Sequence, residues 1–381
     1  MVRHEDAVKG SKALPIIIAS LVVLFALACI GVMYLGMQAQ EEEAPVQSFQ
    51  APSAAPQDAG LSMSESAVPE HADDVIMTLN GDRDTVVLAG EEYLEAGCHA
   101  VQEGVGIVTD AVQTTGEVDA STPGDYTVTY TLETSDGRYA DATRTVHVVD
   151  EMEKAADLPV LMYHWVYTAM DVPDDLDGNY ILDTDLEQEL AYLNEKDCYY
   201  PSFEEVRAFV DGTHSLPAKS VVVTFDDGEQ GFLDYGIPLL EEYEVPATSF
   251  YICIDDDSGD GSPMRTLTYA SPFVRFQSHS YDLHKAGGSS IGRGGAIYDL
   301  SADELIADAR SAERVLGEVE AMAYPFGDND ETARAAFEDA GLLCAFTIQN
   351  ARVVPGDDPY ALPRVRVSGD YTLDGFKDLI A

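Results

Sequence analysis

Two neighbouring carboxylates stand at the end of an apolar run, because the stretch "SVVVTFDDG" leads directly into Asp226 and Asp227. Histidines end similar runs: His164 closes "LPVLMYH" and His279 closes "FVRFQSH", with His284 five residues further along. Two imidazoles plus a carboxylate form a ligand set that a divalent metal such as zinc accepts, with water in an open position. The residue types therefore predict a hydrolytic metal centre.

The twin aspartates suggest a division of labour. One carboxylate can bind the metal, while the other acts as a general base on a water that the metal has acidified. Adjacent aspartates are also common in plain turns, which is the competing interpretation. His279 and His284 lie on opposite faces of a strand and about 140° apart on a helix. Only an irregular loop could bring both to one ion.

The elements around these residues indicate an α/β domain from about 158 to the end of the sequence. Continuous apolar runs are typical of strands buried on both faces, and amphipathic helices are expected between them. Such alternation predicts a parallel barrel or an open wound sheet, with its site at the carboxyl ends of the strands. The expected strands lie at 158–164, 220–225, 247–254, 273–279, 321–325 and 344–348, and the clearest helices at 185–196, 301–319 and 331–341.

The stretch from about 158 to 380 resembles the polysaccharide deacetylases, the metal-dependent carbohydrate esterases with a NodB-homology domain. "TFDDG" at 224–228 is the most specific agreement, and "SHSYDLH" at 278–284 resembles the metal-histidine motif. "YPFG" and "LPRVRV" agree more weakly. "PVLMYH", together with the five-residue histidine spacing, points to the branch that resembles poly-N-acetylglucosamine deacetylases. The resemblance implies a distorted (β/α) barrel with fewer than eight regular units.

The resemblance also implies roles for individual residues. Asp226 would be the general base, and Asp227, His279 and His284 would bind one divalent metal ion, expected to be zinc. His164 would be the general acid that protonates the departing amine. The implied reaction is hydrolysis of an N-acetyl group, which leaves acetate and a glucosamine unit.

Further residues are implied at the edge of the site. The backbone N–H of Tyr324 would stabilise the oxyanion. Many relatives have an arginine before "YPFG" that partners the base, but this chain reads "AMAYPFG", so Arg364 or Arg366 would supply that charge from another strand. Either arginine could instead be a surface ion-pair residue. Trp165 would stack on a sugar, although packing beside a strand is the alternative.

Residues 75–150 show a different pattern. Short alternating runs are separated by turn residues, as in "GDYTVTYTL", where Tyr126, Val128, Tyr130 and Leu132 share one face. Several such strands predict a small all-β sandwich. Together with "LNGDRDTVVLAGEEYLEAGCHAVQ", this segment resembles bacterial immunoglobulin-like domains of surface proteins. That resemblance implies a spacer or adhesion module.

The N-terminal part predicts a membrane anchor. Residues 14–37 are apolar and uncharged, long enough for one transmembrane helix, with basic residues before them and Glu41 to Glu43 after them. The positive-inside rule places 1–13 in the cytoplasm and the rest outside the cell. A cleaved signal peptide is the alternative. Residues 38–74 are rich in Ala, Pro, Ser and acids and predict a disordered linker to the domain at 158–381.

The amino-acid composition limits the kinds of partner that the protein can bind. The chain has 21 basic and 69 acidic residues, for a formal net charge of -48, which excludes nucleic acid as a natural partner. Cys98, Cys198, Cys253 and Cys344 are too widely spaced for a disulfide pattern to be assigned. The sequence predicts metal-dependent deacetylation of an extracellular N-acetylglucosamine polysaccharide, either poly-N-acetylglucosamine or peptidoglycan. The alternative is a catalytically inactive surface protein that binds carbohydrate or mediates adhesion.

Overall fold

The computed structural model describes residues 70–257 and 264–381. The membrane segment predicted at 14–37 and most of the linker predicted at 38–74 lie outside these residues. Within the described ranges, no helix is both long and apolar enough to cross a membrane.

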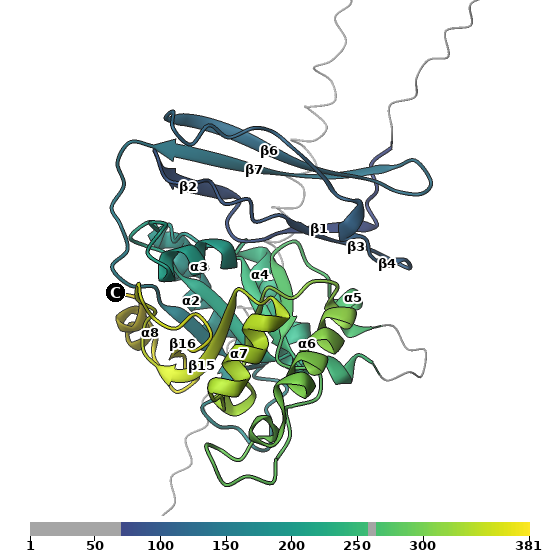
Figure 1. Cartoon of the computed structure of the whole chain (residues 1–381), viewed down its shortest axis with the longest axis vertical. Helices are drawn as coiled ribbons and strands as arrows, with labels where there is room; N and C mark the ends of the chain where they lie inside the picture. Colours follow the sequence, from purple (N-terminus) through teal and green to yellow (C-terminus); the bar gives the residue numbers. More distant parts are fainter. Residues whose placement is uncertain (1–69, 258–263) are drawn as a thin grey trace, which may run out of the picture. The chain divides into compact units, whose positions relative to one another are not determined.

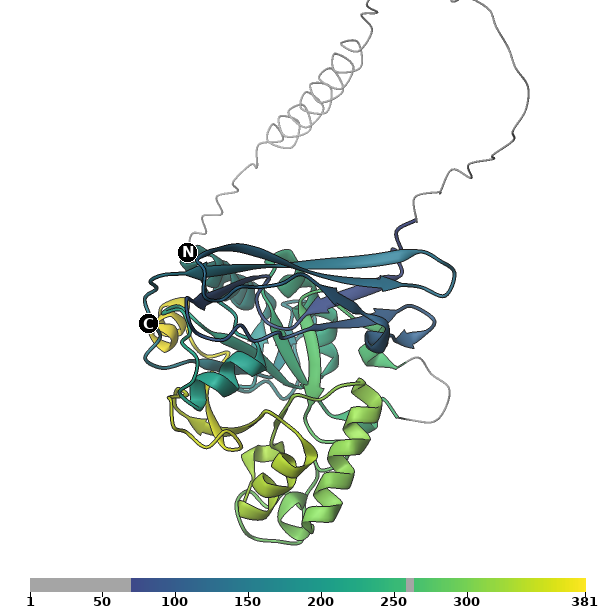
Figure 2. The ribbon, with the colours of Figure 1, turned by 45° about the horizontal axis from the view of Figure 1, so that its top comes forward.

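The first part of the described chain is a sandwich of two sheets. One sheet has the order β2-β7-β6-β5, and the other has the order β1-β3-β4. The long strands β6 and β7 are visible in Figures 1 and 2, and Val128, Tyr130 and Leu132 of β6 are buried as the alternation predicts. The strands are β1 (Val75–Leu79), β2 (Asp84–Leu88), β3 (Cys98–Gln102), β4 (Gly106–Ile107), β5 (Gln113–Thr115), β6 (Gly124–Glu133) and β7 (Tyr139–Val149).

The second part is a closed barrel of seven parallel strands in the order β11-β12-β13-β14-β15-β16-β8. Six of these strands coincide with the apolar runs expected from the sequence, and the seventh is formed by "LPRVRV". The barrel form, rather than the open wound sheet, is therefore correct. The strands are β8 (Val160–Tyr163), β11 (Val222–Asp227), β12 (Ala247–Tyr251), β13 (Val274–Ser278), β14 (Ala321–Ala323), β15 (Cys344–Asn350) and β16 (Leu362–Arg366).

Helices surround the barrel and follow local sequence signals. Ser301 forms a capping box with Glu304 at the start of α6, and Gly341 ends α7 in the left-handed conformation. A short parallel pair, β9 (Trp165–Tyr167) and β10 (Tyr180–Leu182), lies outside the barrel order. The helices are α2 (Asp183–Lys196), α3 (Phe203–Val210), α4 (Ile237–Glu242), α5 (Arg265–Thr268), α6 (Ala302–Leu316), α7 (Glu331–Ala340) and α8 (Leu373–Ile380).

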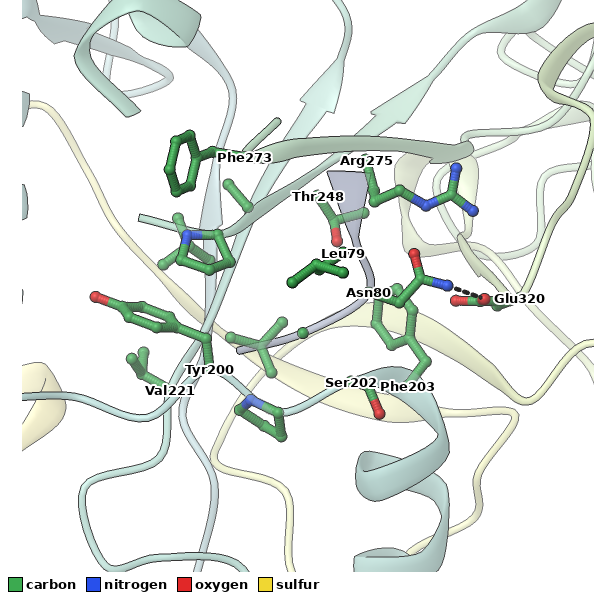
Figure 3. A pocket seen from close by; sticks show the side chains of 16 residues that line it. Leu79, Asn80, Tyr200, Ser202, Phe203, Val221, Thr248, Phe273, Arg275 and Glu320 are labelled. Atoms are coloured by element: carbon green, nitrogen blue, oxygen red, sulfur yellow. Dashed lines mark hydrogen bonds between the residues drawn. The ribbon is translucent and has the colours of Figure 1, made fainter. Parts of the chain in front are cut away.

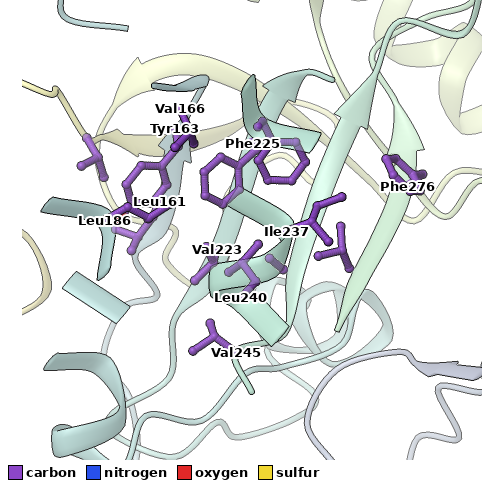
Figure 4. Close-up of a cluster of buried hydrophobic side chains, with 14 of the residues drawn as sticks. Leu161, Tyr163, Val166, Leu186, Val223, Phe225, Ile237, Leu240, Val245 and Phe276 are labelled. Carbon is purple, nitrogen blue, oxygen red and sulfur yellow. The ribbon is translucent and has the colours of Figure 1, made fainter. Parts of the chain in front are cut away.

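Alternation along the barrel strands divides the core into an outer and an inner layer. Figure 4 shows the outer layer, in which Val223 and Phe225 of β11 belong to one cluster with residues of α2 and α4. The inner layer contains apolar side chains from the opposite face of the strands: Val160, Val222, Phe250, Ala323, Phe346 and Leu362. Residues an even number of positions apart on a strand point to the same face. Asp226 shares the face of Val222 on β11, and Arg364 shares the face of Leu362 on β16, so both side chains point into the barrel.

The sandwich contacts the barrel at the amino ends of the barrel strands. Thr78 donates to the carbonyl of Ser271 at 2.6 Å, and the Asn80 amide donates to Glu320 at 2.8 Å. Figure 3 shows the small cavity at this junction, about 40 Å³ in volume, lined by Leu79, Asn80 and residues that begin β11, β12 and β13. The sandwich therefore covers the end of the barrel opposite the carboxyl ends of its strands.

Candidate active site and metal centre

The end of β11 separates its two aspartates. Asp227 has φ +74° and Gly228 has φ +69°, so the chain enters the left-handed region immediately after Asp226. A Cβ on Gly228 would lie 2.1 Å from the ring of Tyr251, which explains why glycine is needed here. The two carboxylates consequently point in different directions from adjacent positions.

Asp227, His279 and His284 form a group of potential metal ligands. Their ligand atoms all lie within 4.8 Å of one another. Asp227 Oδ1 is 3.3 Å from His279 Nε2 and 3.5 Å from His284 Nε2. Nδ1 of His279 is 2.8 Å from the carbonyl oxygen of Ala323, a contact that orients the ring and leaves Nε2 for an ion. Two imidazoles and one carboxylate in this arrangement fit zinc.

The charge state of Asp227 suits a metal ligand. Burial raises the pKa of Asp227, but the hydrogen bond from His279 and the neighbouring histidine charges outweigh it, and the net shift is well below the ordinary value. Asp227 is therefore an ionised carboxylate at neutral pH.

An irregular loop brings His284 beside His279, as the five-residue spacing requires. Ser280 has φ +72°, and its hydroxyl accepts from the N–H of Leu283 at 3.0 Å. Asp308 of α6 accepts from the N–H groups of Tyr281 and Asp282, at 2.8 and 2.9 Å. Sequence reasoning missed Asp308, although a carboxylate within the buried stripe of an amphipathic helix was an available signal.

Asp226 is held by an arginine of β16, a strand separated from β11 in the barrel only by β8. Arg364, fully buried, donates to Asp226 Oδ1 at 2.7 Å and to Oδ2 at 2.6 Å. Nε of Arg364 also donates to the carbonyl of Thr347 at 3.0 Å. Burial raises the pKa of Asp226, but the charge and hydrogen bonds of Arg364 outweigh it, so the net shift is downward. Asp226 is thus fixed as a carboxylate beside the triad.

His164 faces the same carboxylate, with Nε2 3.9 Å from Asp226 Oδ2. Burial lowers the pKa of His164, and the negative charges of Asp226 and Asp227 offset this only in part. The histidine is therefore neutral at physiological pH in this structure.

The remaining residues expected at the site are Arg366, Tyr324 and Trp165, and each has a different hydrogen-bond partner. Arg366 does not contact Asp226 among the described residues; it donates to the side chain of Asn179. The N–H of Tyr324 donates to the carbonyl of Phe346 at 2.9 Å, and its ring is fully buried. The expectation that this N–H faces a substrate oxyanion is therefore wrong for this conformation, because the strand ladder uses it. Trp165 donates its indole N–H to Asp227.

A groove of about 640 Å³ lies next to the triad. Charged and polar side chains share its lining with the apolar side chains of Trp165 and Ile252, and Asp227 and His284 are part of its wall. The other lining residues include Glu229, Gln230, Asp255 and Arg265. The arrangement can therefore place an uncharged polar substrate against a metal ion and an adjacent base.

The four cysteines of the described residues, Cys98, Cys198, Cys253 and Cys344, are all free. None of them takes part in the triad.

Two known families match separate parts of the chain. Residues 77–148 match the Ig-like domain of bacterial surface proteins, and residues 213–345 match polysaccharide deacetylase. A Staphylococcus epidermidis protein named poly-beta-1,6-N-acetyl-D-glucosamine N-deacetylase is 28% identical over 204 residues, covering 50% of this chain and 68% of that protein. A Staphylococcus aureus protein of the same name is 23% identical over 196 residues, covering 48% of this chain and 66% of that protein.

The fold also matches a solved structure. The Streptococcus pyogenes deacetylase PplD, solved in complex with acetate, aligns with a TM-score of 0.50 at 19% identity. The alignment covers 60% of this chain and 99% of that one. At this identity the match supports the barrel fold.

Proposed function

We propose that this chain, which carries a polysaccharide deacetylase domain preceded by a bacterial Ig-like domain, is a metal-dependent hydrolase that removes acetyl groups from an extracellular N-acetylglucosamine polysaccharide. The observation that carries the proposal is the Asp227, His279 and His284 triad beside a carboxylate clamped by Arg364. A base placed within reach of a metal site is the arrangement that amide hydrolysis needs.

Asp227, His279 and His284 would hold one divalent ion, with zinc as the expected metal. When bound, such an ion polarises an amide carbonyl and lowers the pKa of a water. Asp226 would act as the general base, taking a proton from the attacking water as the water oxygen adds to the acetyl carbon. Arg364 keeps the carboxylate in one orientation during this transfer.

The leaving group needs a proton of its own. The C–N bond breaks as acetate forms, and an amine is too basic to leave as an anion. We assign this step to His164, whose Nε2 is 3.9 Å from Asp226 Oδ2 and which would deliver the proton to the amine. A proton accepted at the site from water can pass to the imidazole, because the nearby carboxylates stabilise its charged form.

The substrate class is supported by the curated relatives, whose names specify poly-beta-1,6-N-acetyl-D-glucosamine. Peptidoglycan glycan strands are the second N-acetylglucosamine polymer to be tested. Acids at the groove, Glu229 and Asp255, would attract the cationic amine that each deacetylation creates. The segment at 14–37 is proposed as the membrane anchor that holds this domain outside the cell.

Acetate release from both polymers tests the proposal. The purified protein should release acetate, lose activity on treatment with a chelator, and recover it with zinc. Asp226→Asn should lower the rate by about 10²- to 10⁴-fold, the range typical of general-base removal. Asp303→Asn, which changes an exposed acid on α6, is the matched control and should leave the rate unchanged. A folded protein that releases no acetate from either polymer would favour the non-catalytic alternative.

A further inference from the structure

We propose that Trp165 is a positioning residue that holds the metal-ligand carboxylate of Asp227 in its binding orientation. This inference rests on the proposed metal centre and adds a role for the only tryptophan in the chain. The indole Nε1 donates to Asp227 Oδ2 at 2.9 Å. The other oxygen, Oδ1, is the one near both histidines.

The two oxygens of Asp227 therefore have different partners. The terminal torsion of an aspartate is broad, so a carboxylate without a second contact can rotate between orientations. A donor on Oδ2 fixes the plane of the group and aims Oδ1 at the space between His279 and His284. Hydrogen bonds of this kind to ligating carboxylates commonly tune metal affinity.

Trp165 is itself held in place by three contacts. Its backbone N–H donates to the carbonyl of Asn179 at 3.1 Å, and it pairs in register with Tyr180 between β9 and β10. The Tyr180 ring meets the indole edge-on, with centroids 4.6 Å apart. Arg366 donates to the Asn179 side chain. Arg366, expected near the base, thus supports the segment that carries Trp165.

The chemistry of the donor also fits its position. Asp226 is paired with the cation of Arg364, which keeps a base ionised in a buried site. A cation in the same position on Asp227 would repel a metal ion. The indole N–H is a neutral donor, so it can orient the carboxylate without competing with the metal for its charge.

The single tryptophan permits an atom-level test. In a tryptophan-auxotrophic host, β-(benzothiophen-3-yl)alanine replaces the indole N–H by sulfur, and the substitution affects position 165 alone. Zinc affinity of the metal-free protein is then measured by competition with a chromophoric chelator. We expect binding to weaken by about 10- to 100-fold, the usual cost of losing a partner of a metal ligand. The thermal midpoint of the metal-free protein should stay unchanged.

Trp165→Phe should weaken zinc binding to a similar extent, whereas Tyr167→Phe, on the same strand, should not. Zinc affinity equal to that of the unsubstituted protein in the benzothienyl form would overturn the inference while leaving the proposed function intact. If the unsubstituted protein binds no zinc, both the inference and the metal centre are wrong. If Trp165→Phe does not fold, the zinc affinity of the benzothienyl form, which keeps the shape of the indole, tests the inference alone.

Discussion

Replacing Arg364 by glutamine tests whether the base is held by a buried charge pair. Arg364 is fully buried and Asp226 is 2% exposed, so loss of the arginine leaves an uncompensated carboxylate inside the barrel. Breaking one partner of a buried pair typically costs about 3–5 kcal/mol. Since 1 kcal/mol shifts the Tm of a domain of this size by about 2–4 °C, the Tm should fall by about 6–20 °C.

The assay is thermal unfolding at neutral pH of the unsubstituted protein, Arg364→Gln, and the double variant Asp226→Asn/Arg364→Gln. The double variant should be more stable than Arg364→Gln alone, because the amide removes the unpaired charge. Arg334→Gln is the matched control, since its ion pair with Asp358 is 40% and 45% exposed and should contribute about 0–1 kcal/mol. An Arg364→Gln protein as stable as the control, with no rescue in the double variant, would refute the argument.

Three further predictions address the metal, the strand end and the core. His279→Ala should reduce the zinc content of the purified protein from about one ion per chain to almost none, as measured by mass spectrometry of the metal; unchanged content would remove His279 from the ligand set. Gly228→Ala should lower the Tm more than Gly356→Ala. Both glycines have positive φ, but only at Gly228 would a Cβ lie against Tyr251, at 2.1 Å. Equal decreases in Tm would show that the contact with Tyr251 relaxes freely. Burial raises the pKa of Glu189 to about 8. The contribution of Glu189 to folding stability is therefore complete below the pKa that this carboxyl has in the unfolded chain, and it is lost as pH rises through about 8. Glu189→Gln should make the decrease in Tm between about pH 5 and pH 8 less steep, and an unchanged slope would show that Glu189 does not cause this decrease.

The strands and their end residues could be predicted from the sequence because burial on both faces leaves a continuous apolar pattern. His164, Asp226 and His279 all follow such runs, and parallel strands bring their carboxyl ends to one edge. The closed barrel then brings these three side chains close together at one end. The choice between an open sheet and a closed barrel depends on the pairing of β16 with β8, which no local pattern reveals.

Other parts of the site could not be read from the sequence. Arg364 and Arg366 are two residues apart and share one side of β16, so only their depth in the barrel decides which one reaches Asp226. The Tyr324 N–H is used by the β14–β15 ladder, and this depends on register. The indole contact of Trp165 joins β9 to the end of β11, across 62 residues of sequence. These features arise from tertiary packing.

The junction with the sandwich has a consequence for how a long glycan would be handled. Apolar side chains and the Arg364–Asp226 pair occupy the barrel interior, and Leu79 of β1 and the following residue Asn80 lie at its amino end, so a chain of sugars has no route through the protein. Under the proposed function, a polymer would lie across the rim at the carboxyl ends of the strands instead. Units in the middle of a strand would then reach the reaction centre as readily as units at its termini, and modification would not have to begin from an end.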